Sequence, residues 1–259
     1  MKTTKFKTLY MLCAATMVVG TVTGQEFKLS KSSGRLEIRD VNRVTIEGNN
    51  GSEIIFSTRG SDREKDKRAE GLRAVSSFGL EDNTGLGLSV VDKGDRVEVH
   101  ALKRMEDTEF LIKVPKGVTV AYFHTTPYGD DFTIRNFDGN VEVTMVHNDI
   151  SMSNVTGKLN VKSVHGDIDV VMPNTIANPA SITSVHGHVD VSLPTDARLN
   201  LKLATAWGEI FVDPGFKLEF SDNGGMRRFS EKIEATLNGG GAELELSSTH
   251  SNVYLRKKQ

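Results

Sequence analysis

The chain has 259 residues, one cysteine and a formal net charge of −2, from 32 basic and 34 acidic side chains. A slightly acidic balance argues against nucleic acid and anionic membrane surfaces as partners. A single cysteine excludes an internal disulfide framework, so stability has to come from a packed core and from backbone hydrogen bonds.

Residues 1–24 have the features of a secretory signal peptide. Lys2, Lys5 and Lys7 precede an apolar stretch from about Leu9 to Gly20, and a cleavage site follows at residues 22–24. The stretch is too short to remain as a membrane span, and no later segment is apolar for long enough to cross a bilayer. We therefore expect export to the periplasm, the outer-membrane surface or the medium.

Residues 25–120 are predicted to form a β-rich cap and the first coils of the domain. Short alternating segments at 27–29, 36–38, 44–46 and 54–56 are separated by Gly and Asn turns. The charged run from Arg59 to Arg73 mixes both signs and predicts a solvated loop or short helix. Two apolar segments flank Asp92-Lys93-Gly94-Asp95, which predicts a β-hairpin.

From residue 121 onward one short turn pattern recurs. The copies are Gly129–Phe132, Val146–Ile150, Val164–Ile168, Val185–Val189, Ala206–Ile210 and Thr249–Val253, at spacings of 18, 18, 21, 21 and 43 residues. A fixed period near 20 residues without a helical rhythm predicts a solenoid, in which equivalent residues of successive coils stack on one another.

Apolar residues at constant offsets from each turn indicate which side chains face inward. After the turn, two inward columns include Ile150 and Met152; before it, three columns include Leu159, Val161 and Val164, respectively. Polar residues such as Glu142 and Ser151 alternate with them and are predicted to face solvent. We expect the coils to stack in chain order, with long corners at residues 172–179 and 213–238.

The predicted fold is an all-β, right-handed, single-stranded parallel β-helix of about 18–21 residues per coil. It forms one continuous domain over residues 25–259, with an irregular cap at 25–120 and regular coils at 121–259. Residues 213–238 form an insertion before the last coil. Such insertions serve as binding surfaces or as edge covers, and the sequence leaves both open.

Two columns of polar residues beside the turns are the candidate site. The candidate metal ligands are His147, Asp149, His165, Asp167, His186 and His188. Imidazole and carboxylate together suit zinc or copper. Every coil carries the pattern, however, and Trp207 replaces one histidine, so a structural stack that satisfies backbone groups explains all copies. We therefore favour the structural interpretation and expect no metal and no cofactor.

Catalytic motifs are absent from the sequence. It has no G-x-S-x-G, no H-E-x-x-H, no phosphate-binding loop and no cysteine after residue 13. Asp167 and Asp169 could act as a carboxylate pair on a glycosidic bond, but both belong to repeated polar columns. We predict that the chain is not an enzyme.

The chain resembles the bacterial putative-adhesin family of exported β-solenoid proteins. The resemblance is carried by Val164-His165-Gly166-Asp167-Ile168 and by the closing Leu237-Asn238-Gly239-Gly240-Gly241, and it covers nearly all of residues 25–259. The family is of uncharacterised function, and it supplies no role for the histidines.

The resemblance and the repeat together suggest a non-enzymatic adhesin or structural protein of the cell envelope. Its partners would be surface glycans or envelope proteins. The alternatives are a metal- or glycan-binding module that uses the His and Asp columns and, less favoured, a polysaccharide-active enzyme.

Overall fold

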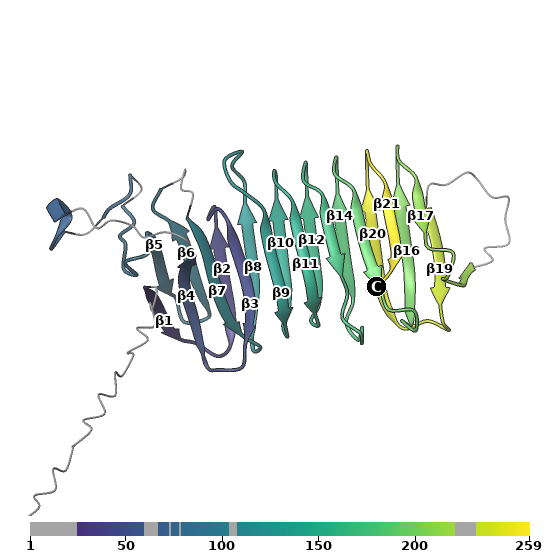
Figure 1. The fold of residues 1–259 in the computed structure, drawn as a ribbon, viewed down its shortest axis with the longest axis horizontal. Coiled ribbons are helices and arrows are strands. Elements are labelled where there is room, and N and C mark those ends of the chain that lie inside the picture. Colours follow the sequence, from purple (N-terminus) through teal and green to yellow (C-terminus); the bar gives the residue numbers. More distant parts are fainter. Residues whose placement is uncertain (1–24, 60–66, 73, 78, 104–107, 221–231) are drawn as a thin grey trace, which may run out of the picture.

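The computed structural model describes all residues except 1–24, 60–66, 73, 78, 104–107 and 221–231. The predicted signal peptide, most of the charged run and the middle of the predicted 213–238 insertion therefore lie outside the described residues. The described strands form two sheets, of 10 and 11 strands. The individual strands run across the long axis of an elongated body, and each sheet extends along that axis (Figure 1). The helical content of this part is one short 3-10 turn, η1 (Lys67–Ala69). The all-β class is confirmed.

The first sheet, here sheet A, contains the strands that leave the turns. In chain order they are β1 (Glu26–Ser30), β3 (Val44–Asn49), β4 (Glu53–Arg59), β7 (Glu109–Pro115), β9 (Phe132–Phe137), β11 (Ile150–Val155), β13 (Ile168–Val171), β15 (Val189–Leu193), β17 (Ile210–Val212) and β21 (Val253–Lys257).

The second sheet, sheet B, contains the strands that enter the turns and two strands of the segment 213–238. They are β2 (Gly34–Arg39), β5 (Leu88–Asp92), β6 (Arg96–Ala101), β8 (Val118–His124), β10 (Val141–Met145), β12 (Leu159–Ser163), β14 (Ala180–Ser184), β16 (Leu199–Thr205), β18 (Leu218–Phe220), β19 (Lys232–Leu237) and β20 (Ala242–Ser248). Strands of the central coils pair in parallel and in register, for example Val161 with Ile182. Like residues therefore stack on like, as the repeat predicts.

The apolar side chains between the sheets form one continuous core. Alternate residues of the central strands are buried; Ile150, Met152, Val161 and Ile182, for example, are at most 1% exposed. Their polar neighbours face water, which confirms the predicted alternation. No helix among the described residues is long and apolar enough to cross a bilayer.

One predicted inward column is wrong. Val146, Val164 and Val185 are partly exposed, and the buried residues are the ones just before them, Met145, Ser163 and Ser184. Strict alternation from Val161 and Ile182 leads to Ser163 and Ser184, so the strand keeps its period and the valines begin the turn.

The buried hydroxyls form a hydroxyl ladder. Its members are Ser163, Ser184, Ser248 and Thr205. Each hydroxyl accepts a hydrogen bond from the backbone N–H three residues later, at 2.9–3.1 Å. The hydroxyls of Ser184, Ser248 and Thr205 also donate to a carbonyl of the neighbouring turn, at 2.8–3.1 Å. Each hydroxyl thus satisfies its own tight turn, and the last three also link it to the next coil.

We expect Ser184→Ala to lower the free energy of unfolding by about 1–3 kcal/mol, since it leaves the Gly187 N–H and the Gly166 carbonyl without this partner. Ser181→Ala, on the outward face of the same strand, removes only an exposed contact to Glu245 and is the matched control. Urea unfolding followed by circular dichroism measures both. Equal effects of the two substitutions would contradict a structural role for the ladder.

The coils do not stack in chain order at the C-terminal end. β20 lies between β14 and β16, and β21 lies between β15 and β17, all in parallel. The last coil in the sequence is therefore the last but one in space, and the marked C-terminus lies beside these coils rather than at the tip (Figure 1). This corrects the expectation that consecutive coils are always neighbours.

The N-terminal end is interleaved in the same manner. β2 lies between β6 and β8, and β3 lies between β7 and β9. Antiparallel strands then close the ends: β1 and β4 beside β7, and β5 beside β6, which confirms the predicted hairpin. At the other end β19 pairs antiparallel with β16, and β18 pairs antiparallel with β19, so that both extend sheet B.

Candidate functional site

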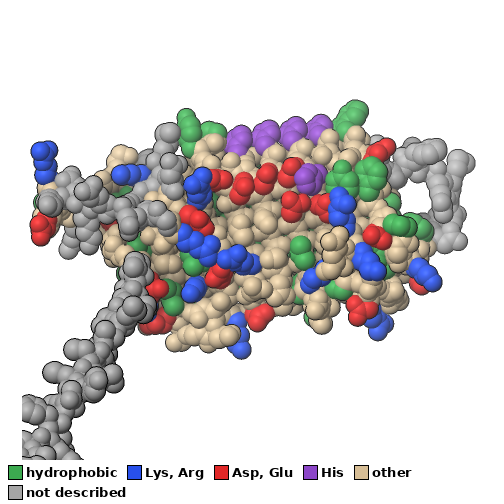
Figure 2. Space-filling view, in the orientation of Figure 1, with side chains coloured by type: hydrophobic (Ala, Val, Ile, Leu, Met, Phe, Trp, Pro, Cys, Tyr) green, Lys and Arg blue, Asp and Glu red, His purple; other side chains and the backbone are tan. Residues whose placement is uncertain are grey.

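The imidazoles of the turns form one stack on the surface. His147, His165, His186 and His250 follow one another with ring centroids 4.7–5.0 Å apart and interplanar angles of 5–15°. Trp207 continues the stack beyond His250, at 6.4 Å, and is 79% exposed. We call these five residues the imidazole ladder; Figure 2 shows its histidines as a purple row along one edge of the molecule. The predicted stacking of residues 147, 165 and 186 is confirmed.

An acid ladder of Asp131, Asp149 and Asp167 runs beside it. An Oδ1 atom of each residue accepts a hydrogen bond from the backbone N–H at the equivalent position of the next coil, at 2.8–3.1 Å. Asn252 does the same for the N–H of Glu209, at 2.9 Å. The carboxylates therefore satisfy the turns between coils, which is the structural role that the repeated pattern predicts.

The six candidate metal ligands are close in space, but their geometry does not favour chelation. Two nitrogens bound to one zinc ion at about 2.0–2.1 Å lie roughly 3.4 Å apart. The rings of His147, His165 and His186 are parallel and 4.8–5.0 Å apart, so their in-plane lone pairs point side by side. Among the described residues, no group of three or more His, Cys, Asp or Glu is arranged to hold a metal ion.

His188 breaks the acid ladder and contacts two carboxylates. Its Nδ1 lies 3.0 Å from Asp167 Oδ1, and its Nε2 lies 3.3 Å from Asp169 Oδ1. These two contacts hold the ring between the two carboxylates. The Asp167 and Asp169 side chains thus both contact one histidine.

An aromatic cluster on sheet A was not predicted. Phe211 and Tyr254 stack at 5.2 Å, the His188 ring meets Tyr254 edge-on at 5.9 Å, and the Arg256 guanidinium lies 4.9 Å from the Tyr254 ring centre. Arg256 also bonds to Asp190 at 2.6 Å. Phe211 is 44% exposed. Tyr and Arg are the residue types that dominate protein interfaces, so this patch is the strongest surface feature of the C-terminal coils.

Phe211 and Tyr254 are 43 positions apart, and only the interleaving of the last coil places them side by side. The sequence signal that could have found the cluster is the phenylalanine and the tyrosine at outward positions that hold Asp or Ser in the earlier coils.

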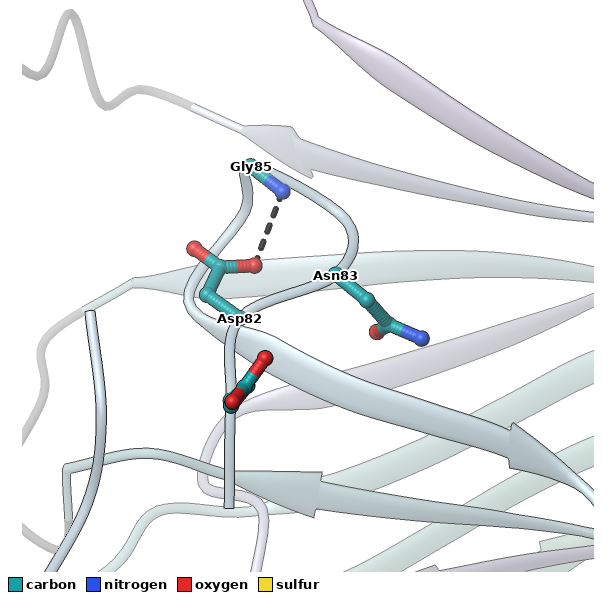
Figure 3. Close-up of a pocket in the computed structure, with 4 residues that line it drawn as sticks. Asp82, Asn83 and Gly85 are labelled. Atoms are coloured by element: carbon teal, nitrogen blue, oxygen red, sulfur yellow. Dashed lines mark hydrogen bonds between the residues drawn. The ribbon is translucent and has the colours of Figure 1, made fainter. Parts of the chain in front are cut away.

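A hollow near the N-terminal end is lined by Glu81, Asp82, Asn83 and Gly85 (Figure 3). Asp82 accepts hydrogen bonds from the backbone N–H groups of Thr84, Gly85 and Gly87, at 2.8–3.0 Å. The Asp82 carboxylate thus shapes the loop that lines the hollow.

His124 is the one histidine that the core buries completely, at 0% exposure. Its Nε2 lies 2.9 Å from Asn42 Oδ1, while its Nδ1 has no partner among the described residues. Burial lowers the pKa of His124, and the nearby His147 adds to this, while Asp40 opposes it. The ring is therefore held in its neutral form.

We expect His124 to make the protein less stable in mild acid. Because its pKa is lower in the folded chain than the ordinary value near 6.5, the unfolded chain binds the proton more readily as the pH falls below about 6.5, and stability is lost there. In His124→Gln the melting temperature should fall less between pH 7.5 and pH 5.5 than in the wild type. Parallel melting curves for the two proteins over this range would contradict the assignment.

The fold and its surface define a class: two large, mostly parallel sheets wound as a β-solenoid-like body whose turns are joined by stacked polar side chains. The model of the Toastrack DUF4097 family matches residues 15–255, and the chain belongs to this family. A search of curated proteins finds no match.

Two solved structures are similar to the chain at low sequence identity. One is described as a putative cell adhesion protein from Clostridium sporogenes ATCC 15579; it is 12% identical, with a TM-score of 0.44, over 91% of this chain and 100% of the other. The second is described as a putative adhesin from Bacteroides fragilis NCTC 9343; it is 10% identical, with a TM-score of 0.31, over 91% and 98% of the two chains.

Proposed function

We propose that the chain is an exported, non-enzymatic β-solenoid that binds a macromolecule of the cell envelope, as an adhesin or as a structural protein. The observation that carries this proposal is the gathering of large rings on the C-terminal coils: Trp207 and Phe211 are exposed, and Tyr254, which stacks on Phe211, is partly exposed. Exposed aromatic side chains beside an arginine are typical of binding surfaces.

The remaining polar groups support a scaffold rather than a catalyst. The hydroxyl ladder and the acid ladder are hydrogen-bonded to the backbone of the turns. Among the described residues, no hydrogen bond joins an imidazole of the ladder to a hydroxyl group, as a nucleophile and its base would require.

The proposal includes the cellular location and the domain organisation of the chain. Residues 1–24 direct export, and residues 25–259 form one continuous domain with a cap at 25–120 and regular coils at 121–259. The protein then works in the periplasm, at the outer-membrane surface or outside the cell. The coils wind with a right hand, as a single-stranded β-helix.

A sedimentation assay with a washed bacterial envelope fraction tests the proposal. Residues 25–259 should co-sediment with the envelope, and the double variant Trp207→Ser, Tyr254→Ser should bind at least tenfold more weakly. Asn160→Ala, Lys162→Ala on the outward face of sheet B is the control and should bind like the wild type. Absence of binding by the wild type, or equal binding by the aromatic variant, would contradict the proposal.

A glycan-binding module is the second candidate, because the exposed rings also suit the apolar faces of sugars. Digestion of the polysaccharides in the envelope fraction before the assay distinguishes a glycan partner from a protein partner. Loss of binding indicates a glycan, and retention indicates a protein. A zinc or copper titration of the wild type and of His165→Ala, His186→Ala tests the metal-binding alternative. Release of new reducing ends from envelope polysaccharides would establish an enzyme instead.

A further inference from the structure

Among the described strands, sheet A ends at the C-terminal side in β17, which no further strand covers. β17 pairs only with β21 among the described strands. The Glu209 carbonyl accepts from Val253 N–H at 3.0 Å, and Asp213 N–H donates to the Leu255 carbonyl at 2.9 Å. In a parallel ladder alternate residues bond to opposite sides. The N–H and C=O groups of Ile210 and Val212 therefore point away from β21, toward the free edge.

The apolar side chains at this edge are incompletely covered. In the neighbouring coil the inward residues Val253 and Leu255 are 0% and 1% exposed, whereas Ile210 and Val212 are only partly buried. On the outward face Phe211 covers Tyr254 with one ring face and leaves the other toward the edge. One further strand beside β17 would be needed to bury the inward side chains at this edge of sheet A.

The other three sheet edges carry charged or polar side chains. At β1, Glu26 and Lys28 place charges on the exposed face. β18 carries the exposed Glu219, next to the exposed Phe220. At β5 the side chain of Asn83 occupies the edge, since it donates to the Val90 carbonyl at 2.6 Å and accepts from the Val90 N–H at 2.9 Å; Figure 3 shows this side chain directed toward the neighbouring strand.

β17 has none of these devices. Its three residues, Ile210, Phe211 and Val212, are all apolar, and the strand contains neither a charge nor a proline. An unprotected apolar edge is a template for pairing with another strand, and natural sheets guard against it unless the edge is used.

We propose that the β17 edge is the docking site for an extended segment of a partner protein, which adds one strand to sheet A. Main-chain bonds to Ile210 and Val212 would hold it, and alternate apolar side chains would cover these two residues inside and Phe211 outside. The inference rests on the proposed envelope-binding function. It specifies that the envelope macromolecule bound by this chain is a protein.

The shape of this end favours a single strand over a second copy of the chain. β19 and β18 carry sheet B two strands past β16, while β17 is the last described strand of sheet A at this end. In a two-fold pairing of β17 with itself, sheet B of the second copy would have to lie where β19 and β18 already are.

The test uses a fluorescein-labelled peptide of residues 163–171, which contain a turn and β13 of this chain. That segment already forms parallel ladders with β11 and β15, so it is competent for the same pairing. Fluorescence anisotropy should show saturable binding to the full domain. Val212→Pro removes an outward N–H without removing a bond to β21 and should weaken binding at least tenfold.

Phe211→Ser is the second variant, which alters only a side chain, and it should weaken binding at least threefold. Val91→Lys, at the edge strand β5, is the control and should bind like the wild type. The inference would be overturned if the wild type showed no saturable binding, or if both variants bound the peptide as tightly as the wild type. So would a concentration-dependent dimer, seen by light scattering, that Val212→Pro abolishes, because it would show that a second copy occupies the edge.

The envelope assay separates this inference from the proposed function. If Val212→Pro loses the peptide and also loses the envelope, both are supported. If it loses the peptide but keeps full envelope binding, the proposed function stands and the inference is overturned. If the wild type binds the peptide but not the envelope, the proposed function fails and the edge site remains.

Discussion

Gly166→Val should lower the free energy of unfolding by at least about 3 kcal/mol, the upper range for overpacking, because the turns leave no room for a side chain between coils. A Cβ atom at this position would lie 1.7 Å from the Asn148 carbonyl oxygen. Gly187 and Gly208 face the same restriction, at 2.1 and 2.0 Å from the carbonyls of Gly166 and Ser251. The glycines are thus required by the close stacking of turns along one edge.

Ser251 shows under which condition a turn accepts a side chain at the position of Gly166. It occupies the corresponding position of one coil, so a turn can hold a Cβ when its neighbours are placed around it. At Gly166 the adjacent turns are already fixed by the hydroxyl ladder, and a shift would break the bonds of Ser163 and Ser184.

Thermal unfolding followed by circular dichroism measures the effect, with an expected fall in melting temperature of roughly 6–12 °C for a domain of this size. His165→Ala, on the same turn, is the control and should cost about 1 kcal/mol or less, because the ring is exposed and contributes only stacking. A Gly166→Val protein that melts with the control would contradict the close contact between coils.

Deletion of residues 242–259 should abolish the cooperative fold rather than shorten the solenoid. These residues form β20 and β21, which separate two other coils. Leu244, Leu246, Val253 and Leu255 are at most 1% exposed and contribute about 6–12 kcal/mol at 1.5–3 kcal/mol each. The whole stability of a domain is about 5–15 kcal/mol, so the loss is comparable with the total.

The measurement is a thermal melt and size-exclusion profile of the truncated chain, with and without a synthetic peptide of residues 242–259. We expect an aggregated or unfolded chain alone and partial recovery with the peptide. A truncated chain that melts cooperatively near the full-length temperature would show that the last coil is an end cap.

Much of the fold follows from the sequence because residues of the same chemical type recur at equivalent positions of successive coils. Alternation fixes which residues of a strand face inward, and the common period aligns His147 with His165 and His186. The register of the central coils needs no further information, since a slip of one residue would place the apolar columns in water.

The coil order does not follow from the sequence. The inward columns are alike in every coil, so Ala180 is suited equally to Leu201 of the next coil or to Leu244 of the last. The long connection from residue 213 to residue 241 makes the second choice accessible, and the spacing of 43 was its only trace. The Phe211 and Tyr254 pair depends on that order and was missed for the same reason.

The hydroxyl ladder was missed for a different reason. Val164 and Val185 are apolar and next to the turn, so composition favours them as core residues. The signal that outweighs it is Ser or Thr three residues before a turn Gly or Ser, as in Ser163–Gly166 and Thr205–Gly208, because such a hydroxyl caps a tight turn.

The most direct test of the account is disulfide trapping of the coil order, in a chain with Cys13 replaced by serine. The rings of His186 and His250 lie 4.7 Å apart on adjacent coils, whereas Trp207 lies one coil further. Neighbouring parallel strands are about 4.8 Å apart, within reach of a disulfide, and twice that distance is not. We predict that His186→Cys, His250→Cys oxidises to a cross-linked form on a non-reducing gel and that His186→Cys, Trp207→Cys does not; the reverse result would contradict the interleaved solenoid.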